Sequence, residues 1–368
     1  MAVGINCGKG TRRGADELEA ALSITGWLMV AATVLPLVRS EHWVVRVFDF
    51  PRLQITVVFV AVFAGYLAVR GDPGLADQLF LGLMALCLAY QLWRMWPYTP
   101  LHPRQVKRAE RSDDPRTLSL LISNILMTNR DAEKLRALIR RHDPDLVMVV
   151  ETDAWWEAQL RDVERTRPHV LRRPQANTYG MLLYSRYPLV DPQFRFLVQG
   201  DVPSIHAGVR LPSGDCVTLR GLHPRPPAPG ESATSKERDA ELLIVAKELQ
   251  GRDEPCIVVG DLNDVAWSRT NAMFQKISGL LDPRVGRGFY STFNANWPPI
   301  RFPLDHAFVS RQFRVAAFEV LPHVGSDHFP VFARLVLSPP SDGDPNREPP
   351  PPSADEEREA RDKIRRAT

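Results

Sequence analysis

The sequence predicts a membrane-anchored α/β protein, in which membrane-spanning helices precede a soluble domain of mixed strands and helices. Two observations predict this fold class. Apolar residues crowd into three runs without charged residues within the first hundred positions. From about residue 116 to about residue 338, short apolar runs typical of strands alternate with amphipathic helical segments. So many strands with interspersed helices indicate a two-layered sheet packed between helices.

The three apolar runs cover residues 22–38, 53–69 and 79–93. A helix needs roughly 17 to 20 such residues to cross a bilayer, and the third run reaches this length when residues 76–78 are included. Trp27 and Trp93 lie within or near the runs, as interfacial aromatic residues often do. Three buried helices of a soluble domain are the alternative, but such helices usually carry a polar stripe. A cleaved signal peptide is disfavoured because two more runs follow the first. We therefore expect three membrane spans.

Charge and cysteine content exclude few classes of protein. The net charge of +3 is too small to argue for a polyanionic partner such as nucleic acid, although it does not exclude one. The four cysteines form no C-x-x-C pair, so neither a zinc knuckle nor a thioredoxin-like motif is predicted, and a Cys216–Cys256 disulfide stays open. Basic residues around the apolar runs nearly balance, so they do not assign the soluble domain to one side of the membrane.

Composition divides the chain into four segments. Residues 1–100 form the predicted membrane anchor, and residues 101–115 are basic and proline-containing, as expected of a linker. Residues 116–338 form the soluble domain. Residues 339–368 are rich in proline and then in charge, with too few apolar residues to bury a core, so we expect a disordered or loosely helical tail.

Polar side chains stand where the apolar strands of the soluble domain stop. Strand ends converge at one edge of a sheet, so such residues can face one cleft although they lie far apart in sequence. The candidates, in chain order, are Asn124, Glu151, His223, Asp261, Asn263, Asp305, Asp327 and His328.

This set of residue types suits phosphoester hydrolysis. A hard cation such as Mg²⁺ prefers carboxylate and amide oxygens, so Asn124, Glu151 and Asp327 are the candidate metal ligands. Asp261 can orient and deprotonate water, and Asn263 can hydrogen-bond a phosphate oxygen without adding negative charge. A histidine oriented by a carboxylate can contact developing charge or move a proton. His328 with Asp305 fits that role, and His223 is a second candidate donor.

Each of these residues also has a structural interpretation. Asp261 and Asn263 can form an Asx turn after a strand. Asp327 and His328 can cap a turn, and Glu151 can be a solvated residue at a strand end. Their joint occurrence in order favours function. His206, His306 and His323 are interpreted as structural, His306 because the neighbour of Asp305 on a strand points to the opposite face.

Six motifs in one order resemble the endonuclease/exonuclease/phosphatase family. The resemblance spans about residues 117–337, nearly the whole soluble domain. The motifs are SNI at 123–125, DLVMVVE at 145–151, the segment 180–188 from Gly180 to Pro188, His223, GDLN at 260–263, and LDH at 304–306 with GSDHFP at 325–330. Single motifs of this kind are weak, but their common order is specific.

The resemblance implies a four-layered α/β sandwich of the DNase I-like type. It implies Mg²⁺, with Mn²⁺ as the alternative, held at the positions of Asn124, Glu151 and Asp327. It also implies water activation by Asp261, phosphate contact by Asn263 and an Asp305–His328 pair. His223 would lie near the scissile phosphate. This sequence departs from the family in one respect, because no acidic partner that would orient His223 is identifiable.

The family covers nucleases, phosphatases and lipid-directed enzymes, so the fold does not settle the substrate. Three spans before the domain favour a lipid-linked phosphate or pyrophosphate, with the lipid bilayer as partner. This layout also resembles a branch of the family whose members cross a bacterial-type cell membrane several times. That branch is associated with glycopeptide resistance and with dephosphorylation of polyprenyl carriers. A membrane-tethered nuclease and a non-catalytic binding module are the alternatives. Nucleic acid is not favoured because no basic stripe with interleaved aromatics stands out.

Overall fold

A computed structural model describes residues 8–69, 73–110, 115–338 and 346–368. The chain divides into two compact units, residues 1–96 and residues 97–368. The thiols of Cys87, Cys216 and Cys256 are free, so the disulfide left open by the sequence is not formed.

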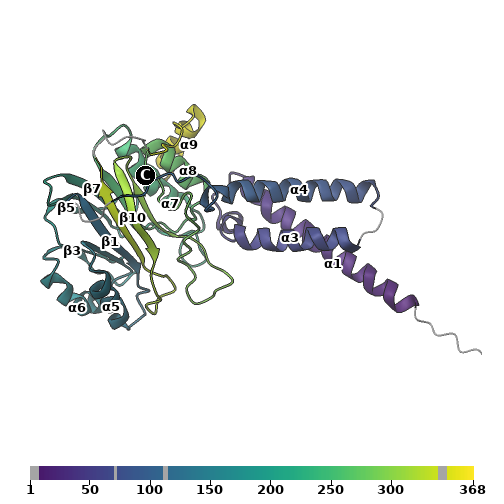
Figure 1. The fold of residues 1–368 in the computed structure, drawn as a ribbon, viewed down its shortest axis with the longest axis horizontal. Helices are drawn as coiled ribbons and strands as arrows, with labels where there is room; N and C mark the ends of the chain where they lie inside the picture. Colours follow the sequence, from purple (N-terminus) through teal and green to yellow (C-terminus); the bar gives the residue numbers. More distant parts are fainter. Residues whose placement is uncertain (1–7, 70–72, 111–114, 339–345) are drawn as a thin grey trace, which may run out of the picture. The chain divides into compact units, whose positions relative to one another are not determined.

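The first unit consists of three long helices, α1 (Gly8–Val34), α3 (Arg52–Val69) and α4 (Leu75–Met95) (Figure 1). Short helical turns at Leu35–Leu37, Trp43–Arg46 and Val47–Asp49 connect α1 to α3. The segments Asp16–Leu37, Arg52–Val69 and Leu75–Tyr98 are long and apolar enough to cross a membrane, as the sequence predicts.

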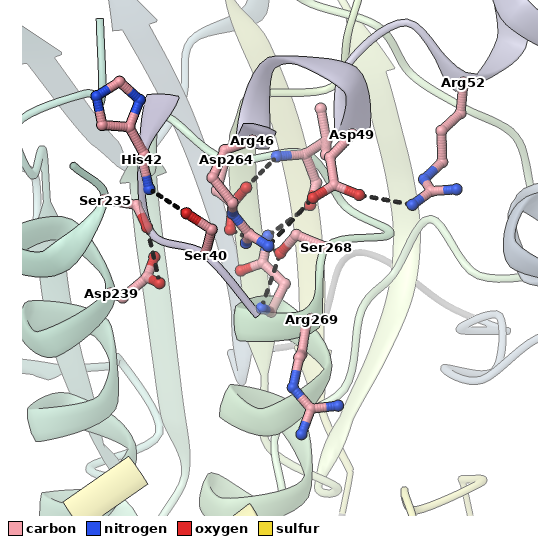
Figure 2. Close-up of polar contacts among 12 residues, drawn as sticks. Ser40, His42, Arg46, Asp49, Arg52, Ser235, Asp239, Asp264, Ser268 and Arg269 are labelled. Carbon is pink, nitrogen blue, oxygen red and sulfur yellow. Dashed lines mark hydrogen bonds and ion pairs between the residues drawn. The ribbon is translucent and has the colours of Figure 1, made fainter. Parts of the chain in front are cut away.

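A buried polar cluster lies at the start of α3. Arg52 donates to Asp49 at 2.6 Å and to Gln91 of α4 at 2.8 Å. Asp49 also forms an ion pair with Arg46 at 3.2 Å, and Figure 2 shows these three charged side chains along one connecting turn. Burial of a charge is tolerated because each charged group has a partner.

The second unit contains two β-sheets in the part of the chain that the structure describes. The six-stranded sheet has the order β10-β11-β1-β2-β4-β3 and the five-stranded sheet the order β5-β6-β7-β8-β9. The strands of the first sheet are β10 (Phe313–Val320), β11 (Val331–Leu337), β1 (Thr117–Asn124), β2 (Leu146–Val150), β4 (Met181–Ser185) and β3 (His169–Arg173). Those of the second are β5 (Leu189–Arg195), β6 (Ser204–Arg210), β7 (Cys216–Leu222), β8 (Cys256–Asp261) and β9 (Asp305–Val309).

The two sheets and their helices form four layers. One apolar core lies between the sheets and joins, for example, Ile122 of β1 to Val259 of β8. A second core packs the other face of the six-stranded sheet against α5 (Ala132–His142) and α6 (Ala154–Gln159). A third packs the five-stranded sheet against α7 (Lys236–Leu249), α8 (Arg269–Ser278) and α9 (Ala354–Ala367), which Figure 1 shows on the opposite side from α5 and α6. The predicted four-layered α/β sandwich is confirmed.

The segment expected to be a linker, residues 101–115, is largely part of the second unit. Val106 is fully buried in the core between the sheets. Main-chain hydrogen bonds join Val315 of β10 to Lys107 and Ala109, both at 2.9 Å. Just before this segment, the hydroxyl of Tyr98 donates to the carbonyl of Ala266 at 2.7 Å. The prediction was wrong for residues 101–109 because one apolar residue and main-chain pairing, rather than overall composition, hold this strap in place. Residues 111–114 lie outside the described residues.

The tail expected to be disordered or loosely helical ends in a packed helix. A capping box between Ser353 and Glu356 begins α9, and Ala360 is fully buried in the core with α7 and α8. Three acidic residues of α9 form ion pairs with basic residues of α7 and α8, namely Glu356 with Lys276, Glu357 with Lys247, and Glu359 with Arg269. The expectation of disorder fails because these ion pairs add to the few apolar contacts that the helix makes. Residues 339–345 lie outside the described residues.

Helix α7 contains a buried carboxyl group, that of Glu241, which makes the stability of the protein depend on pH. Glu241 is 3% exposed, its Oε1 has no hydrogen-bond partner among the described residues, and burial raises its pKa from 4.5 to about 8. Because this folded-state pKa lies above the ordinary value, the folded protein holds a proton that the unfolded chain releases between pH 4.5 and 8. The free energy of unfolding therefore falls as pH rises through this window.

We expect Glu241→Gln to stabilise the protein at pH 8 and to change little at pH 4.5. The gain should grow by about 1.4 kcal/mol for each pH unit inside the window, since only the wild type must ionise or hold a proton there. Thermal unfolding of the full chain in detergent at several pH values measures this, with Glu254→Gln at an exposed site as the control. A gain independent of pH would contradict the assignment.

Candidate active site

The register of the sheets brings the predicted strand-end residues to one edge. β1 and β2 are parallel in the first sheet, and β7 and β8 are parallel in the second, so their carboxyl ends point the same way. β9 is antiparallel to β8 and begins at Asp305, which pairs directly with Asp261. β11 is antiparallel to β1, so the turn that carries His328 before β11 reaches the same edge.

Asn124 forms hydrogen bonds with two carboxyl groups of the candidate site. Its Nδ2 donates to Glu151 Oε1 at 2.7 Å and to Asp261 Oδ2 at 3.0 Å, which ties the two sheets together. Its Oδ1 accepts from the main chain of Leu126 at 3.0 Å. Glu151 has a left-handed φ of 62°, which costs a non-glycine residue energy and is typical of functional sites.

The predicted Asp305–His328 pair is present. His328 Nδ1 lies 2.8 Å from Asp305 Oδ2, and His328 Nε2 lies 3.5 Å from Asp261 Oδ2. All three side chains are buried. They also form one group of potential cation ligands, with one atom of each within 4.8 Å of the others. This group differs from the predicted ligand set, but the Asn124–Asp261 hydrogen bond joins the two.

Charges within the site shift several pKa values. Burial raises the pKa of Glu151 to about 7, the Asn124 hydrogen bond opposes this, and neighbouring Asp261 adds to it. Burial also raises the pKa of Asp261. Burial alone would lower the pKa of His328, but the negative charges of Asp261 and Asp305 raise it to about 10. The imidazole of His328 is therefore protonated, and it lies beside carboxyl groups whose ionised forms are disfavoured by burial.

The segment after β8 forms the Asx turn considered from the sequence, and it still lies in the site. Asp261 Oδ1 accepts from the main chain of Asn263 at 2.9 Å, and Asn263 Nδ2 donates to the carbonyl of Pro224 at 3.0 Å. Gly260 has a φ of 142°, and a Cβ there would lie 1.9 Å from the Leu222 carbonyl oxygen. Only glycine fits, because the main chains of β7 and β8 approach closely before the turn.

His223 is buried at the end of β7, and no acidic residue contacts it directly at hydrogen-bonding distance within the described chain. Its Nε2 lies 3.9 Å from Asp261 Oδ2, and burial lowers its pKa. Tyr179 packs on its ring at 5.4 Å, and the hydroxyl of Tyr179 donates to Glu231 at 2.7 Å. The ring of Tyr179, rather than an acidic residue, therefore contacts His223. The sequence did not indicate Tyr179 or Glu231 as site residues. The only available signal was that Tyr179 directly precedes Gly180, the first residue of the motif at 180–188.

Asp327 and its surroundings complete the edge. Its Oδ1 accepts from Ser326 Oγ at 3.3 Å, and its charge contributes to the raised pKa of His328. No hydrogen bond in the described structure joins it to Asn124 or Glu151. Phe293, a third residue that the sequence did not indicate, packs on His328 with ring centroids 5.0 Å apart. His306 is instead held by Arg284 and the Asp264 carbonyl, at 2.6 and 2.8 Å.

A buried charge network supports the turn after β8. Arg238 of α7 donates to the carbonyl of Asn263 at 2.7 Å and to Asp239 Oδ1 at 2.8 Å. Lys363 of α9 donates to the other oxygen of Asp239 at 2.8 Å. Asp264 lies 3.3 Å from Arg238. Figure 2 shows the neighbouring hydroxyl contacts, Ser235 with Asp239 at 3.1 Å and Ser268 with Asp264 at 2.6 Å.

Two sheets packed between helices, with acidic and histidine side chains gathered at one edge, define a DNase I-like fold with a candidate hydrolytic site. The sequence profile of the Endonuclease/Exonuclease/phosphatase family matches residues 121–328. The chain belongs to this family, whose members are phosphoester hydrolases dependent on divalent metals.

The chain is also similar to solved structures, the first of which agrees on the fold. The endonuclease/exonuclease/phosphatase from Bacteroides vulgatus is 16% identical, with 60% of this chain and 99% of that chain covered and a TM-score of 0.50. The corresponding protein from Beutenbergia cavernae DSM 12333 is 20% identical, with 61% and 72% covered and a TM-score of 0.49. D. rerio TDP2 complexed with single-strand DNA product is 17% identical, with 60% and 98% covered and a TM-score of 0.48. No curated protein matches the chain.

Proposed function

We propose that this protein is a membrane-anchored, Mg²⁺-dependent hydrolase of a lipid-linked phosphate or pyrophosphate. The observation that carries the hydrolytic part is the buried cluster in which Asn124 bridges Glu151 and Asp261, with the Asp305–His328 pair beside it. Such an arrangement supplies a water-activating base, a cation-binding edge and a positive group for phosphate within one site.

The residues of this edge fit a divalent cation. Asp305 Oδ1 is buried without a hydrogen-bond partner among the described residues. Burial, with the charge of Asp261 adding to it, raises the pKa of Glu151, and a bound cation would stabilise the ionised form of this carboxyl group. Hard carboxylate and amide oxygens suit Mg²⁺ or Mn²⁺. We assign Glu151, Asn124 and Asp327 as the residues that hold it. When bound, the cation neutralises phosphate charge and stabilises the transition state.

The remaining residues have separate roles in this proposal. Asp261 accepts the proton of the water that attacks phosphorus, since burial gives its carboxylate a raised proton affinity. Protonated His328, held by Asp305, stabilises the charge that develops on the phosphoryl oxygens. Asn263 and neutral His223 donate hydrogen bonds to the phosphate. The Asp305 contact fixes which ring nitrogen of His328 faces the site.

Chain connectivity supports the lipid part of the proposal. Helix α4 ends at Met95, and Tyr98, three residues on, is bound to the Ala266 carbonyl, five residues beyond Asp261. Three residues of chain span at most about 11 Å, so no long linker separates the third apolar helix from the unit that holds the site. A site tethered so closely to a bilayer meets lipid phosphates at high effective concentration.

The test offers two substrates in parallel to the detergent-solubilised full chain. A polyprenyl pyrophosphate and plasmid DNA are each incubated with Mg²⁺, with EDTA and the Asp261→Asn variant as controls. We expect phosphate release from the lipid, intact DNA, and no product with EDTA or the variant. Nicked DNA with intact lipid would replace the lipid assignment by a membrane-tethered nuclease, and product formation in EDTA would overturn the metal assignment.

A further inference from the structure

A pocket of about 290 Å³ lies on the second unit, apart from the candidate active site. Three segments form it: the strap after Tyr98, the turn that follows Val285, and the edge strand β10. Its lining residues are Pro100, Arg104, Arg108, Gly286, Arg287, Tyr290 and residues 315–318 of β10. We call it the arginine pocket. None of its residues belongs to the candidate active site.

The strap that carries two of the arginines is fixed in place. Gly286 donates to the carbonyl of Pro97 at 2.8 Å, and the side-chain oxygen of Gln105 accepts from the main chain of Asp282 at 2.9 Å. A Cβ on Gly286 would lie 2.7 Å from the Cα of Arg104, so the two main chains are in close contact. The pocket wall is therefore built by the fold and does not depend on a ligand to form.

The lining of the pocket is positively charged. Its lining includes three arginines and no acidic residue among the described residues. Arg104 and Arg108 are exposed, and their side chains form no hydrogen bond or ion pair within the described structure. Arg287 donates to the carbonyls of Pro283 and Val106 at 2.8 and 2.6 Å, which hold it without neutralising it.

The electrostatic cost of this arrangement is visible at Arg287. Burial and the positive charges of Arg104 and Arg108 lower its pKa to about 10, although the negative charge of Asp282 opposes this shift. Guanidinium groups form paired hydrogen bonds with phosphate oxygens, and two of the five N–H donors of Arg287 go to carbonyls. An anion in the pocket would relieve the repulsion and use the remaining donors.

We propose that the arginine pocket binds the phosphate group of an anionic phospholipid headgroup. Pro100, one of its lining residues, follows the last residue of α4 by only five positions. The end of that helix carries the exposed aromatic residues Trp93 and Trp96, at 66% and 46% exposure, which is typical of the membrane interface. Headgroup phosphates occupy the layer just beyond the end of a span, where clustered basic residues recognise anionic lipids.

The remaining lining suits the rest of a headgroup. Val315 and Phe318 of β10 give the pocket an apolar wall beside the arginines, and Tyr290 packs edge-on against Phe318 at 5.0 Å. A pocket of about 290 Å³ is at the small end for ligand sites, as a headgroup requires. The inference is independent of the reaction, because Asp261 and its neighbours take no part in the pocket.

The test measures lipid retention by the full chain. The protein is purified in detergent with phosphatidylglycerol, phosphatidylcholine or neither, and bound lipid is counted by native mass spectrometry. Arg104→Gln/Arg108→Gln is compared with Arg141→Gln/Arg252→Gln, which removes the same charge from exposed positions elsewhere. We expect the wild type and the control to retain more phosphatidylglycerol than phosphatidylcholine. The pocket variant should retain at least ten-fold less phosphatidylglycerol than the wild type.

Two further measurements distinguish a lipid phosphate from free phosphate, and this proposal from the proposed hydrolytic function. Inorganic phosphate that displaces the lipid and raises thermal stability with the same arginine dependence would make this a free-anion site and overturn the lipid assignment. Equal retention by the pocket variant and its control would also overturn it. Asp261→Asn should retain lipid like the wild type, so a failure of the proposed reaction leaves the pocket result intact.

Discussion

Asp261→Asn and Glu151→Gln should each lower Mg²⁺-dependent phosphate release by roughly 10²- to 10⁴-fold, the range of a positioned proton acceptor. Asparagine at 261 cannot accept a proton from water, and glutamine at 151 removes the negative charge assigned to the cation. Both changes preserve side-chain shape. Neither should unfold the protein, because burial already favours the neutral form of both carboxyl groups and raises the pKa of both.

The measurement that separates chemistry from folding combines turnover with thermal unfolding on the same preparations. Asp253→Asn is the matched control, since its carboxylate is 86% exposed and pairs only with Arg311 in the described structure. We expect the control to keep full activity and all three variants to unfold close to the wild-type temperature. Full turnover in Asp261→Asn would remove that residue from the assigned role, whatever the behaviour of Glu151→Gln.

The core strands were predictable because their sequence is continuous and apolar. β2 and β8 are buried along their whole length, so no alternation is needed to recognise them. Edge strands were harder. β5 contains Pro192 and an irregularity between Val190 and Gln193, and β10 has a similar one between Val315 and Ala317. Proline and broken alternation indicate a loop when the partner strand is unknown.

The site was predictable to the extent that it depends on strand ends. Asn124, Asp261 and Asp305 were identifiable because polar residues follow buried strands, and the register then brings them together. The Tyr179–Glu231 contact joins residues far apart in the chain and follows no strand-end pattern, so it required the tertiary structure. The same holds for Arg238, which in the sequence is one charged residue of an amphipathic helix.

The C-terminal helix shows a different limit. Its low apolar content predicted a disordered or loosely helical tail, although S-x-x-E at 353–356 is a capping-box sequence that precedes a helix. The helix is held by ion pairs with α7 and α8 and by Lys363, which reaches the buried Asp239. Charged partners of this kind cannot be assigned from one segment alone, because the complementary residues lie about 100 positions away.

Replacing Arg238 by methionine should destabilise the protein by about 3–5 kcal/mol, since removal of one partner leaves charge in a buried site. Arg238 is 1% exposed, and its guanidinium contacts the carboxylates of Asp239 and Asp264. It also donates to the carbonyl of Asn263, beside the assigned base Asp261. Turnover per folded molecule should therefore fall as well, because the turn that positions Asn263 loses its support.

Lys363→Met tests whether α9 contributes to this network or only covers α7. The Lys363 side chain is 10% exposed and bound to Asp239, so we expect a smaller loss than for Arg238→Met, together with a measurable fall in turnover. Arg365→Met, on the same helix but 79% exposed, is the control and should change neither quantity. Chemical unfolding and turnover are compared for Lys363→Met, Asp239→Asn and the double variant. Additive effects of the two changes would show that Lys363 acts apart from Asp239, because residues within one charge network lose less in combination than the sum of their separate losses.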